Sequence, residues 1–153
     1  MDIKRILAPT DFSDLATRSL EYAVELAKRT GAELVVIYAD PFLPPPHFTS
    51  EQMDELVATL DKHRAAATRE LESYAAKNVA SEVALRTIVV EDTPAAAIVK
   101  TADAINADVI VMGTHGRTGL ARVFVGSVAK QVLANAGCPV ITVKLPAHSA
   151  AQS

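Results

Sequence analysis

Short apolar runs alternate along this chain with longer segments of helical periodicity, and this alternation constrains the fold more than any other feature of the sequence. The apolar runs predict buried strands over residues 3–8, 34–39, 83–90, 108–112 and 139–144. Amphipathic segments that predict helices separate them. Strands that are apolar throughout and alternate with helices are typical of a parallel sheet. We therefore predict an α/β fold with a single open five-stranded parallel sheet and helices on both faces.

Polar residues and prolines mark where the predicted helices begin and end. Ser13 can cap the first helix and Gly31 can end it. Thr49 and Gln52 have the spacing of a capping box, which predicts the start of a long second helix. Before this helix, the prolines within residues 41–46 exclude regular structure. Local signals therefore agree with the order that the periodicity predicts.

The length, charge and cysteine content of the chain limit its organisation and its partners. Its 153 residues are typical of one domain, which we place at residues 1–145, followed by a flexible tail at residues 146–153. The net charge of −3 provides no basic field for nucleic acid. The chain has a single cysteine, no signal-peptide pattern and no apolar stretch of membrane-span length. We therefore expect a cytoplasmic protein without a membrane partner.

The loop after the first strand carries the first candidate binding residues. In open parallel sheets, ligands bind beyond the carboxyl ends of the strands, where the strand order reverses. The loop contains Pro9, Thr10 and Asp11, and Asp11 is its only charged residue. The Asp11 carboxylate can accept hydrogen bonds from ribose hydroxyls, or it can organise the loop and favour the positive end of the next helix. The residues alone leave both roles open.

A glycine-rich loop after the fourth strand is the second candidate. Residues 113–127 contain glycines at 113, 116, 119 and 126 and lead into the fourth helix. The loop lacks the lysine of a Walker A motif and the spacing of a dinucleotide fingerprint. Glycines still let a ligand approach the backbone, and the N–H groups at a helix start favour phosphate. We favour phosphate binding, and glycines that only serve tight turns are the alternative.

The glycine-rich loop also resembles a known motif. It has the spacing G-x2-G-x9-G-S, beginning at Gly113, which resembles the motif of the ATP-binding branch of the universal stress protein family. The resemblance extends to residues 6–13, 107–113 and 138–140. It implies a Rossmann-like sheet of the adenine nucleotide alpha hydrolase-like type. It also implies ATP as the ligand, with a magnesium ion able to bridge the phosphates, and we assign no metal ligand.

The resemblance implies a role for each position that matches. Asp11 would hold the ribose or lie beside the adenine, and Gly113 would pass close to the ribose. Main-chain groups at Ala39 would contact the adenine, and Gly116, Gly126 and Ser127 would surround the phosphates. Arg117 and Arg122 are the candidate cations for the phosphates, with solvated surface arginines as the alternative. The complete candidate site consists of Pro9, Thr10, Asp11, Ala39, Gly113, His115, Gly116, Arg117, Gly126, Ser127 and Val128.

No residue pattern in the sequence indicates catalysis. His115, Ser127 and Asp11 supply the residue types of a hydrolase triad, but no nucleophile elbow surrounds the serine. The other three histidines lack metal-binding spacing, and we expect them to be solvated. We therefore expect an ATP-binding stress or regulatory protein with little hydrolysis and no catalytic residue. A slow ATPase or phosphotransferase, and a dimerising stress protein without nucleotide, are the alternatives.

The last predicted strand indicates how the chain associates. Residues Val140–Val143 are all β-branched and would lie at an edge of the sheet, and exposed edges pair with other strands. The resemblance also implies dimerisation through this strand. We therefore expect a homodimer, and coverage of the edge by a helix or by the tail is the alternative.

Overall fold

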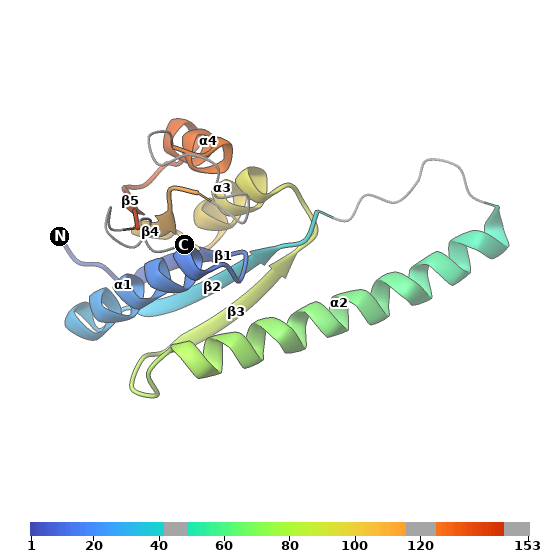
Figure 1. Ribbon diagram of the computed structural model, residues 1–153, viewed down its shortest axis with the longest axis horizontal. Coiled ribbons are helices and arrows are strands. Elements are labelled where there is room, and N and C mark those ends of the chain that lie inside the picture. The colour runs from blue at the N-terminus through green and yellow to red at the C-terminus, as the bar shows by residue number, and fades with distance from the viewer. Residues whose placement is uncertain (42–48, 116–124, 146–153) are drawn as a thin grey trace, which may run out of the picture.

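Strands and helices alternate in the order that the sequence predicts (Figure 1). The computed structural model describes residues 1–41, 49–115 and 125–145, and the tail expected at residues 146–153 lies outside them. The elements are β1 (Arg5–Thr10), α1 (Asp14–Thr30), β2 (Glu33–Ala39), α2 (Ser50–Asn78), β3 (Leu85–Val90), α3 (Pro94–Ala104), β4 (Val109–Gly113), α4 (Ser127–Asn135) and β5 (Val140–Val143). Within the described residues, the strands form one parallel sheet in the order β3-β2-β1-β4-β5. The predicted five-stranded α/β fold is confirmed.

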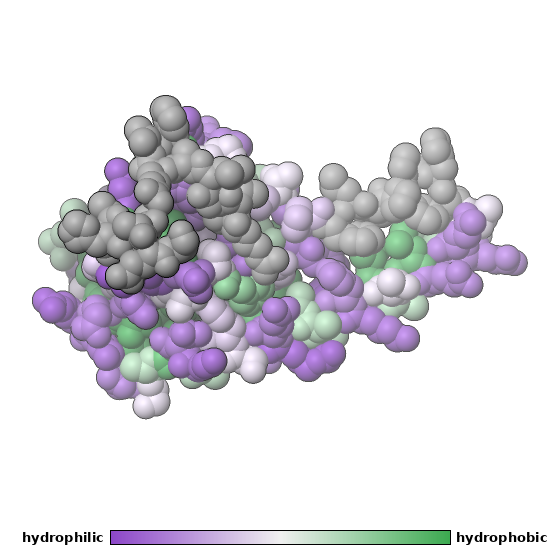
Figure 2. Space-filling view, in the orientation of Figure 1, coloured by the Kyte–Doolittle hydropathy of each residue, from purple (hydrophilic) through white to green (hydrophobic). Residues whose placement is uncertain are grey.

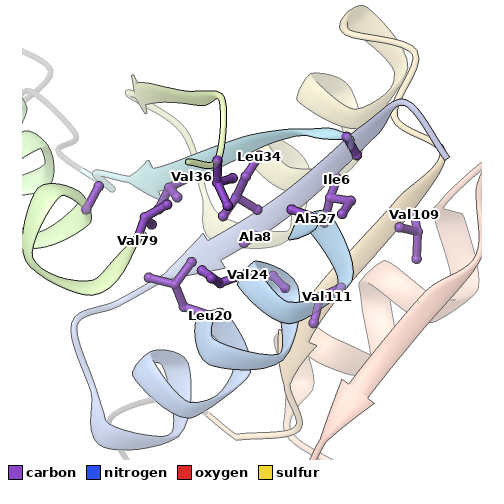
Figure 3. Packing of buried hydrophobic residues seen from close by; sticks show 14 of the residues in the cluster. Ile6, Ala8, Leu20, Val24, Ala27, Leu34, Val36, Val79, Val109 and Val111 are labelled. Carbon is purple, nitrogen blue, oxygen red and sulfur yellow. The ribbon is translucent and has the colours of Figure 1, made fainter. Parts of the chain in front are cut away.

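Two hydrophobic cores, one on each face of the sheet, explain why the strands are apolar throughout. Neighbouring residues of a strand point to opposite faces. In β1, Ile6 and Ala8 belong to the core formed with α1 and α2, whereas Leu7 belongs to the core formed with α3 and α4. Figure 3 shows the first core, where Leu20 and Val24 of α1 lie over the sheet. Helices therefore cover both faces, as predicted.

Strand β1 extends two residues further than the sequence predicts, because Pro9 does not end it. Pro9 and Thr10 still pair with Ile37 and Tyr38 of β2. On its other side, β1 pairs with β4 only as far as Leu7. Proline has no N–H group and is tolerated where one side of a strand is unpaired. The carboxyl end of β1 is thus unpaired on the side that faces β4.

Helix α2 extends far beyond the sheet, as Figure 1 shows. Its buried residues, Ala67, Leu71 and Ala75, all lie in its C-terminal half. Closer to its start, Met53 and Val57 are 46% and 49% exposed, and Figure 2 shows hydrophobic surface on this part of the helix. Only the second half of α2 therefore contributes to the core. None of the helices in the described ranges is long and apolar enough to cross a bilayer.

Two polar contacts fix the middle of α2 to the sheet. Nε2 of His63 lies 2.7 Å from Oδ2 of the buried Asp40, just after β2. Nη2 of Arg64 lies 2.7 Å from Oε1 of Glu91, just after β3. His63 is about half exposed, as expected for a solvated histidine, but sequence reasoning missed its contact with Asp40. The two contacts hold α2 at the carboxyl ends of neighbouring strands.

Candidate functional site

A pocket lies at the carboxyl ends of β1 and β4, where the strand order reverses. The pairing of these strands ends at Leu7 and Ile110, before either strand ends. The pocket has a volume of about 210 Å³ and is also lined by residues of β2, α1, α3 and α4. It therefore occupies the place in an open parallel sheet where ligands bind.

Nine of the residues predicted from the sequence line this pocket. They come from the ends of β1 and β2, from the end of β4 and from the start of α4: Pro9, Thr10, Asp11, Ala39, Gly113, His115, Gly126, Ser127 and Val128. Gly116, Arg117 and Arg122 lie outside the described residues. The fold thus brings the two loops that the sequence indicated to one pocket.

Much of the pocket lining is apolar. Ile37 of β2, Ile98 of α3 and Met112 of β4 contribute to it, with Pro94 at the start of α3. Sequence reasoning missed Ile98 and Met112 as site residues, because their apolar pattern marks them as core residues, and it also missed Pro94. Pro94 did carry a signal, since it begins the helix after β3 and so lies at the same edge of the sheet. This lining can pack on an apolar or aromatic group.

Asp11 organises the loop between β1 and α1. Its Oδ1 accepts a hydrogen bond from the N–H of Ser13 at 3.0 Å, and Oγ1 of Thr10 accepts one from the N–H of Phe12 at 3.0 Å. Ser13 in turn caps α1, because its Oγ accepts the N–H of Ala16. The loop-organising role that the sequence left open is therefore present. The same loop places Asp11 in the pocket lining.

Phe12 has a left-handed backbone conformation, with a φ of +64°, which is uncommon for a residue with a side chain. Its ring packs on those of Tyr38 and Tyr74, with ring centres 4.8 and 5.1 Å apart. The hydroxyl of Tyr74 is hydrogen-bonded to Oγ1 of Thr17 in α1 at 2.8 Å. This aromatic cluster holds the turn next to Asp11. Sequence reasoning missed it, because its members are far apart in the chain.

Packing requires two of the motif glycines. A Cβ atom added to Gly113 would lie 2.8 Å from Cγ of Leu15, and one added to Gly126 would lie 2.9 Å from the carbonyl oxygen of Thr114. Gly126 has a φ of −61°, which any residue can adopt. These glycines therefore allow α1 and α4 to approach the end of β4. They do not serve left-handed turns.

The start of α4 has N–H groups beside the pocket that no described residue accepts. Its N-cap residue, Gly126, has no side chain that could accept them, and the N–H of Gly126 itself donates to the carbonyl of Thr114 at 2.6 Å. Among the described residues, the N–H groups of Ser127, Val128 and Ala129 have no hydrogen-bond partner. All three residues line the pocket. Unpaired N–H groups at the positive end of a helix favour an anion.

His115 lies beside the start of α4, since a Cβ atom on Gly126 would be 3.5 Å from its Cα atom. Its Nδ1 is hydrogen-bonded to Oγ1 of the buried Thr114 at 3.0 Å. Its Nε2 is buried and has no hydrogen-bond partner in the described part of the chain. Leaving such a group unpaired costs about 1–3 kcal/mol. A residue of the pocket lining therefore has a buried polar atom that a hydrogen-bond partner would stabilise.

The described groups with shifted pKa values do not line the pocket. The N–H groups of Arg5 and Lys4 donate to Oδ2 of Asp108 at 2.9 and 2.8 Å and lower the pKa of that carboxyl. Burial raises the pKa of the Cys138 thiol. No group of three or more metal-ligating side chains occurs within residues 1–41, 49–115 and 125–145. The charge effects found here therefore act on the fold, away from the pocket.

The strand order and the position of the pocket place the chain among the open α/β proteins, a class in which ligands bind where the strand order reverses. A family model described as the universal stress protein family matches residues 2–144. The chain therefore belongs to the universal stress protein family, as its motif indicated. A universal stress protein of Methanocaldococcus jannaschii is 39% identical over 145 residues, which cover 94% of this chain and 83% of that relative.

Solved structures of family members share the fold. UspA from Lactobacillus plantarum is 30% identical with a TM-score of 0.71, over 94% of this chain and 99% of that one. A universal stress protein from Archaeoglobus fulgidus in complex with dAMP is 27% identical with a TM-score of 0.64, over 94% and 100%. A universal stress protein in complex with cAMP is 25% identical with a TM-score of 0.61, over 94% and 98%. Two of these similar proteins thus contain an adenine nucleotide.

Proposed function

We propose that this protein binds an adenine nucleotide, ATP in the cell, and acts as a nucleotide-responsive stress protein of the cytoplasm with little or no hydrolysis. The observation that carries the proposal is the combination of three kinds of group around one pocket. These are apolar side chains, a carboxylate, and unpaired N–H donors. The single cysteine of the chain fits a reducing compartment.

Each kind of group matches one part of a nucleotide. Ile37, Ile98 and Met112 can pack on the adenine ring. Main-chain groups at Ala39 can hydrogen-bond to the edge of the ring, and the Asp11 carboxylate can accept hydrogen bonds from ribose hydroxyls. The N–H groups at the start of α4 can donate to a phosphate. A nucleotide contains all three parts in one molecule, which is why we prefer it to a simple anion.

The similar proteins that contain dAMP and cAMP support an adenine nucleotide. The choice of ATP rests on the glycine motif, which resembles that of the ATP-binding branch of the family. The pocket volume of about 210 Å³ is below the roughly 300–1,000 Å³ of pockets that enclose a drug-sized ligand. A bound ATP would therefore remain partly exposed, with its phosphates along the start of α4.

Little hydrolysis is proposed because the chain lacks the features that accelerate phosphoryl transfer. The glycine loop has no Walker lysine to reach the phosphates. Nδ1 of His115 is hydrogen-bonded to Thr114, so this histidine does not have the arrangement of a triad base held by an aspartate. We expect phosphate release far slower than the roughly 1–100 per second of kinases.

Calorimetric titration of ligand-free protein with ATP, AMP and adenosine tests the proposal. We expect ATP to bind, and we expect Asp11→Ala to weaken ATP and adenosine alike because both contain the ribose. Asp14→Ala is the matched control, since it removes an exposed carboxylate of α1 that does not line the pocket. If folded wild-type protein binds none of the three compounds, the proposal is wrong. Phosphate release at kinase-like rates, abolished by a substitution in the pocket, would show an enzyme.

We also propose that the protein forms a homodimer through β5. Within the described residues, β5 is the last strand of the sheet and pairs only with β4. Ile141, in the middle of this edge strand, is 43% exposed. An exposed β-branched edge strand favours pairing with the same strand of a second copy.

A further inference from the structure

His115 has a polar side-chain atom for which the described residues provide no partner. Nε2 is buried, lies in a pocket-lining residue, and has no hydrogen-bond partner among the described residues. Elsewhere in proteins, buried side-chain nitrogens are nearly always paired with protein, ligand or water. The protonation state of the ring therefore decides whether a ligand must offer Nε2 a hydrogen-bond acceptor or a donor.

Thr114 determines which nitrogen of His115 carries the proton. Thr114 is 1% exposed, and Nδ1 of His115, at 3.0 Å, is the hydrogen-bond partner of its hydroxyl within the described residues. A buried hydroxyl needs an acceptor for its proton, whereas its oxygen can remain unpaired at lower cost. This favours the arrangement in which the hydroxyl of Thr114 donates to Nδ1. In the neutral ring, the proton of His115 is then on Nε2, which makes Nε2 a hydrogen-bond donor.

We infer that Nε2–H of His115 donates to the phosphate attached to the ribose of the bound nucleotide. The N–H groups of Ser127, Val128 and Ala129 are also donors without partners in the described part of the chain, and His115 lies beside them. A binding site that offers only hydrogen-bond donors favours a group that only accepts hydrogen bonds, such as a phosphate. A hydroxyl binds there less well, because its own proton also needs an acceptor. This inference rests on the proposed function and adds a residue that selects phosphorylated adenosines over adenosine.

The ratio of the affinity for AMP to the affinity for adenosine tests this role of His115. A hydrogen bond to a charged phosphate should favour AMP over adenosine by roughly 10- to 100-fold. His115→Leu should remove that share of the preference for AMP and leave adenosine binding nearly unchanged. His115→Gln should restore part of it, because the amide of glutamine can donate from about the same place. Thr114→Val should weaken AMP binding by a smaller factor, because either ring nitrogen of His115 can then carry the proton.

Nitrogen-15 NMR of the histidine rings gives a readout that a merely structural role of His115 would not change. In the ligand-free protein we expect the protonated nitrogen of His115 to be Nε2, with the resonances assigned by their absence in His115→Gln. Addition of AMP should shift the Nε2 resonance, and addition of adenosine should not. In Thr114→Val the ligand-free spectrum should show a mixture of the two tautomers.

The outcomes separate this inference from the proposed function. If wild-type protein binds neither AMP, ATP nor adenosine, the proposed function fails and the inference fails with it. If wild-type protein binds nucleotides but folded His115→Leu keeps the wild-type ratio of AMP to adenosine affinity, only the inference is wrong. An Nε2 resonance that is equally affected by adenosine and by AMP would also overturn it, and would indicate a buried water molecule as the partner of Nε2. Should Thr114→Val not fold, the two His115 variants and the wild-type spectra still decide.

Discussion

At the scale of single residues, Phe12 connects the core to the loop that contains Asp11. The left-handed conformation of a residue with a side chain costs about 1–2 kcal/mol, and it persists only where other contacts outweigh that cost. Tyr38 and Tyr74 provide such contacts. Tilted and edge-on aromatic pairs each add about 0.5–1.5 kcal/mol beyond the burial of their surface. The cluster therefore stabilises a turn that the backbone alone would seldom adopt.

Two substitutions of Phe12 separate the contribution of the ring from that of the backbone. Phe12→Ala removes the ring but keeps a Cβ atom in the left-handed conformation, whereas Phe12→Gly removes both. We expect both variants to be less stable than the wild type in urea unfolding, and Phe12→Ala to be the less stable of the two by up to about 1 kcal/mol. Equal stabilities would mean that the backbone stores no strain at this position.

Asp108 gives the stability of the protein a dependence on pH. The N–H groups of Arg5 and Lys4 hold its pKa below the ordinary value of 3.8. Because the pKa is lower in the folded than in the unfolded protein, the carboxylate stabilises the fold above about pH 4. This contribution is lost as the pH falls through the folded pKa.

Substitution of Asp108 should therefore act most at neutral pH. We expect Asp108→Asn to lower the Tm at pH 7 and to reduce the decrease of the Tm between about pH 5 and pH 2. Differential scanning calorimetry over this range measures both effects. Asp2→Asn, which changes an exposed carboxylate outside the strands, serves as the control. A Tm that falls with acid as steeply in Asp108→Asn as in the wild type contradicts the prediction.

At the scale of elements, α2 shows what the sequence can and cannot predict. The capping box is confirmed, because Thr49 and Gln52 exchange hydrogen bonds of 3.3 and 3.0 Å between side chain and main chain. Periodicity shows which residues share a face of the helix, but not how much of that face the sheet covers. Val57 and Leu71 therefore follow the same pattern, although Val57 is 49% exposed and Leu71 is fully buried.

The sequence likewise predicted one part of the candidate site and missed another. Local signals in the sequence predicted the two loops that line the pocket, since turn, cap and motif residues act over short distances. They did not predict the apolar lining from α3 or the ring contacts of Phe12, because both depend on which elements meet in space. They also did not predict that the carbonyl oxygen of Thr114, at the other end of the same glycine-rich loop, leaves no room for a Cβ atom at Gly126.

The approach of α4 to the end of β4 leads to a prediction about Gly126. In Gly126→Ala the new Cβ atom would lie 2.9 Å from the carbonyl oxygen of Thr114, so the start of α4 must move. We expect ATP affinity to fall roughly tenfold or more, because at least one hydrogen bond to phosphate is lost. Ser127→Ala should have a smaller effect, since it keeps the main-chain donors.

Gly137→Ala is the matched control for this experiment. Its Cβ atom would lie 3.4 Å from Oδ1 of Asp103, an exposed side chain that can move, and Gly137 does not line the pocket. Calorimetric titration measures the affinities, and circular dichroism verifies that each variant is folded. Wild-type ATP affinity in folded Gly126→Ala would mean that the start of α4 is not the phosphate site.

At the scale of the whole molecule, the β5 edge leads to a prediction about assembly. We expect light scattering to show a dimer at roughly tens of micromolar. Ile141→Lys should shift the protein toward the monomer, because a lysine on an edge strand opposes pairing. Met53→Lys is the control, since it places the same charge on an exposed apolar residue of α2. A wild-type monomer at this concentration contradicts the proposed dimer.

The pairing within the sheet is uneven, and this has a consequence for how long the folded protein lasts. β1 and β4 share two residue pairs, against six for β1 and β2 and four for β4 and β5. The segment that contains β4, α4 and β5 is thus joined to the rest of the sheet by its shortest ladder, directly below the pocket. A nucleotide held by Asp11 on one side and by α4 on the other would act as a noncovalent cross-link over this ladder. Ligands that bind only the protein in which this ladder is intact oppose local opening, and increasingly so as their concentration rises. The nucleotide level of the cell would then set the rate at which proteases reach this segment, and with it the lifetime of the protein.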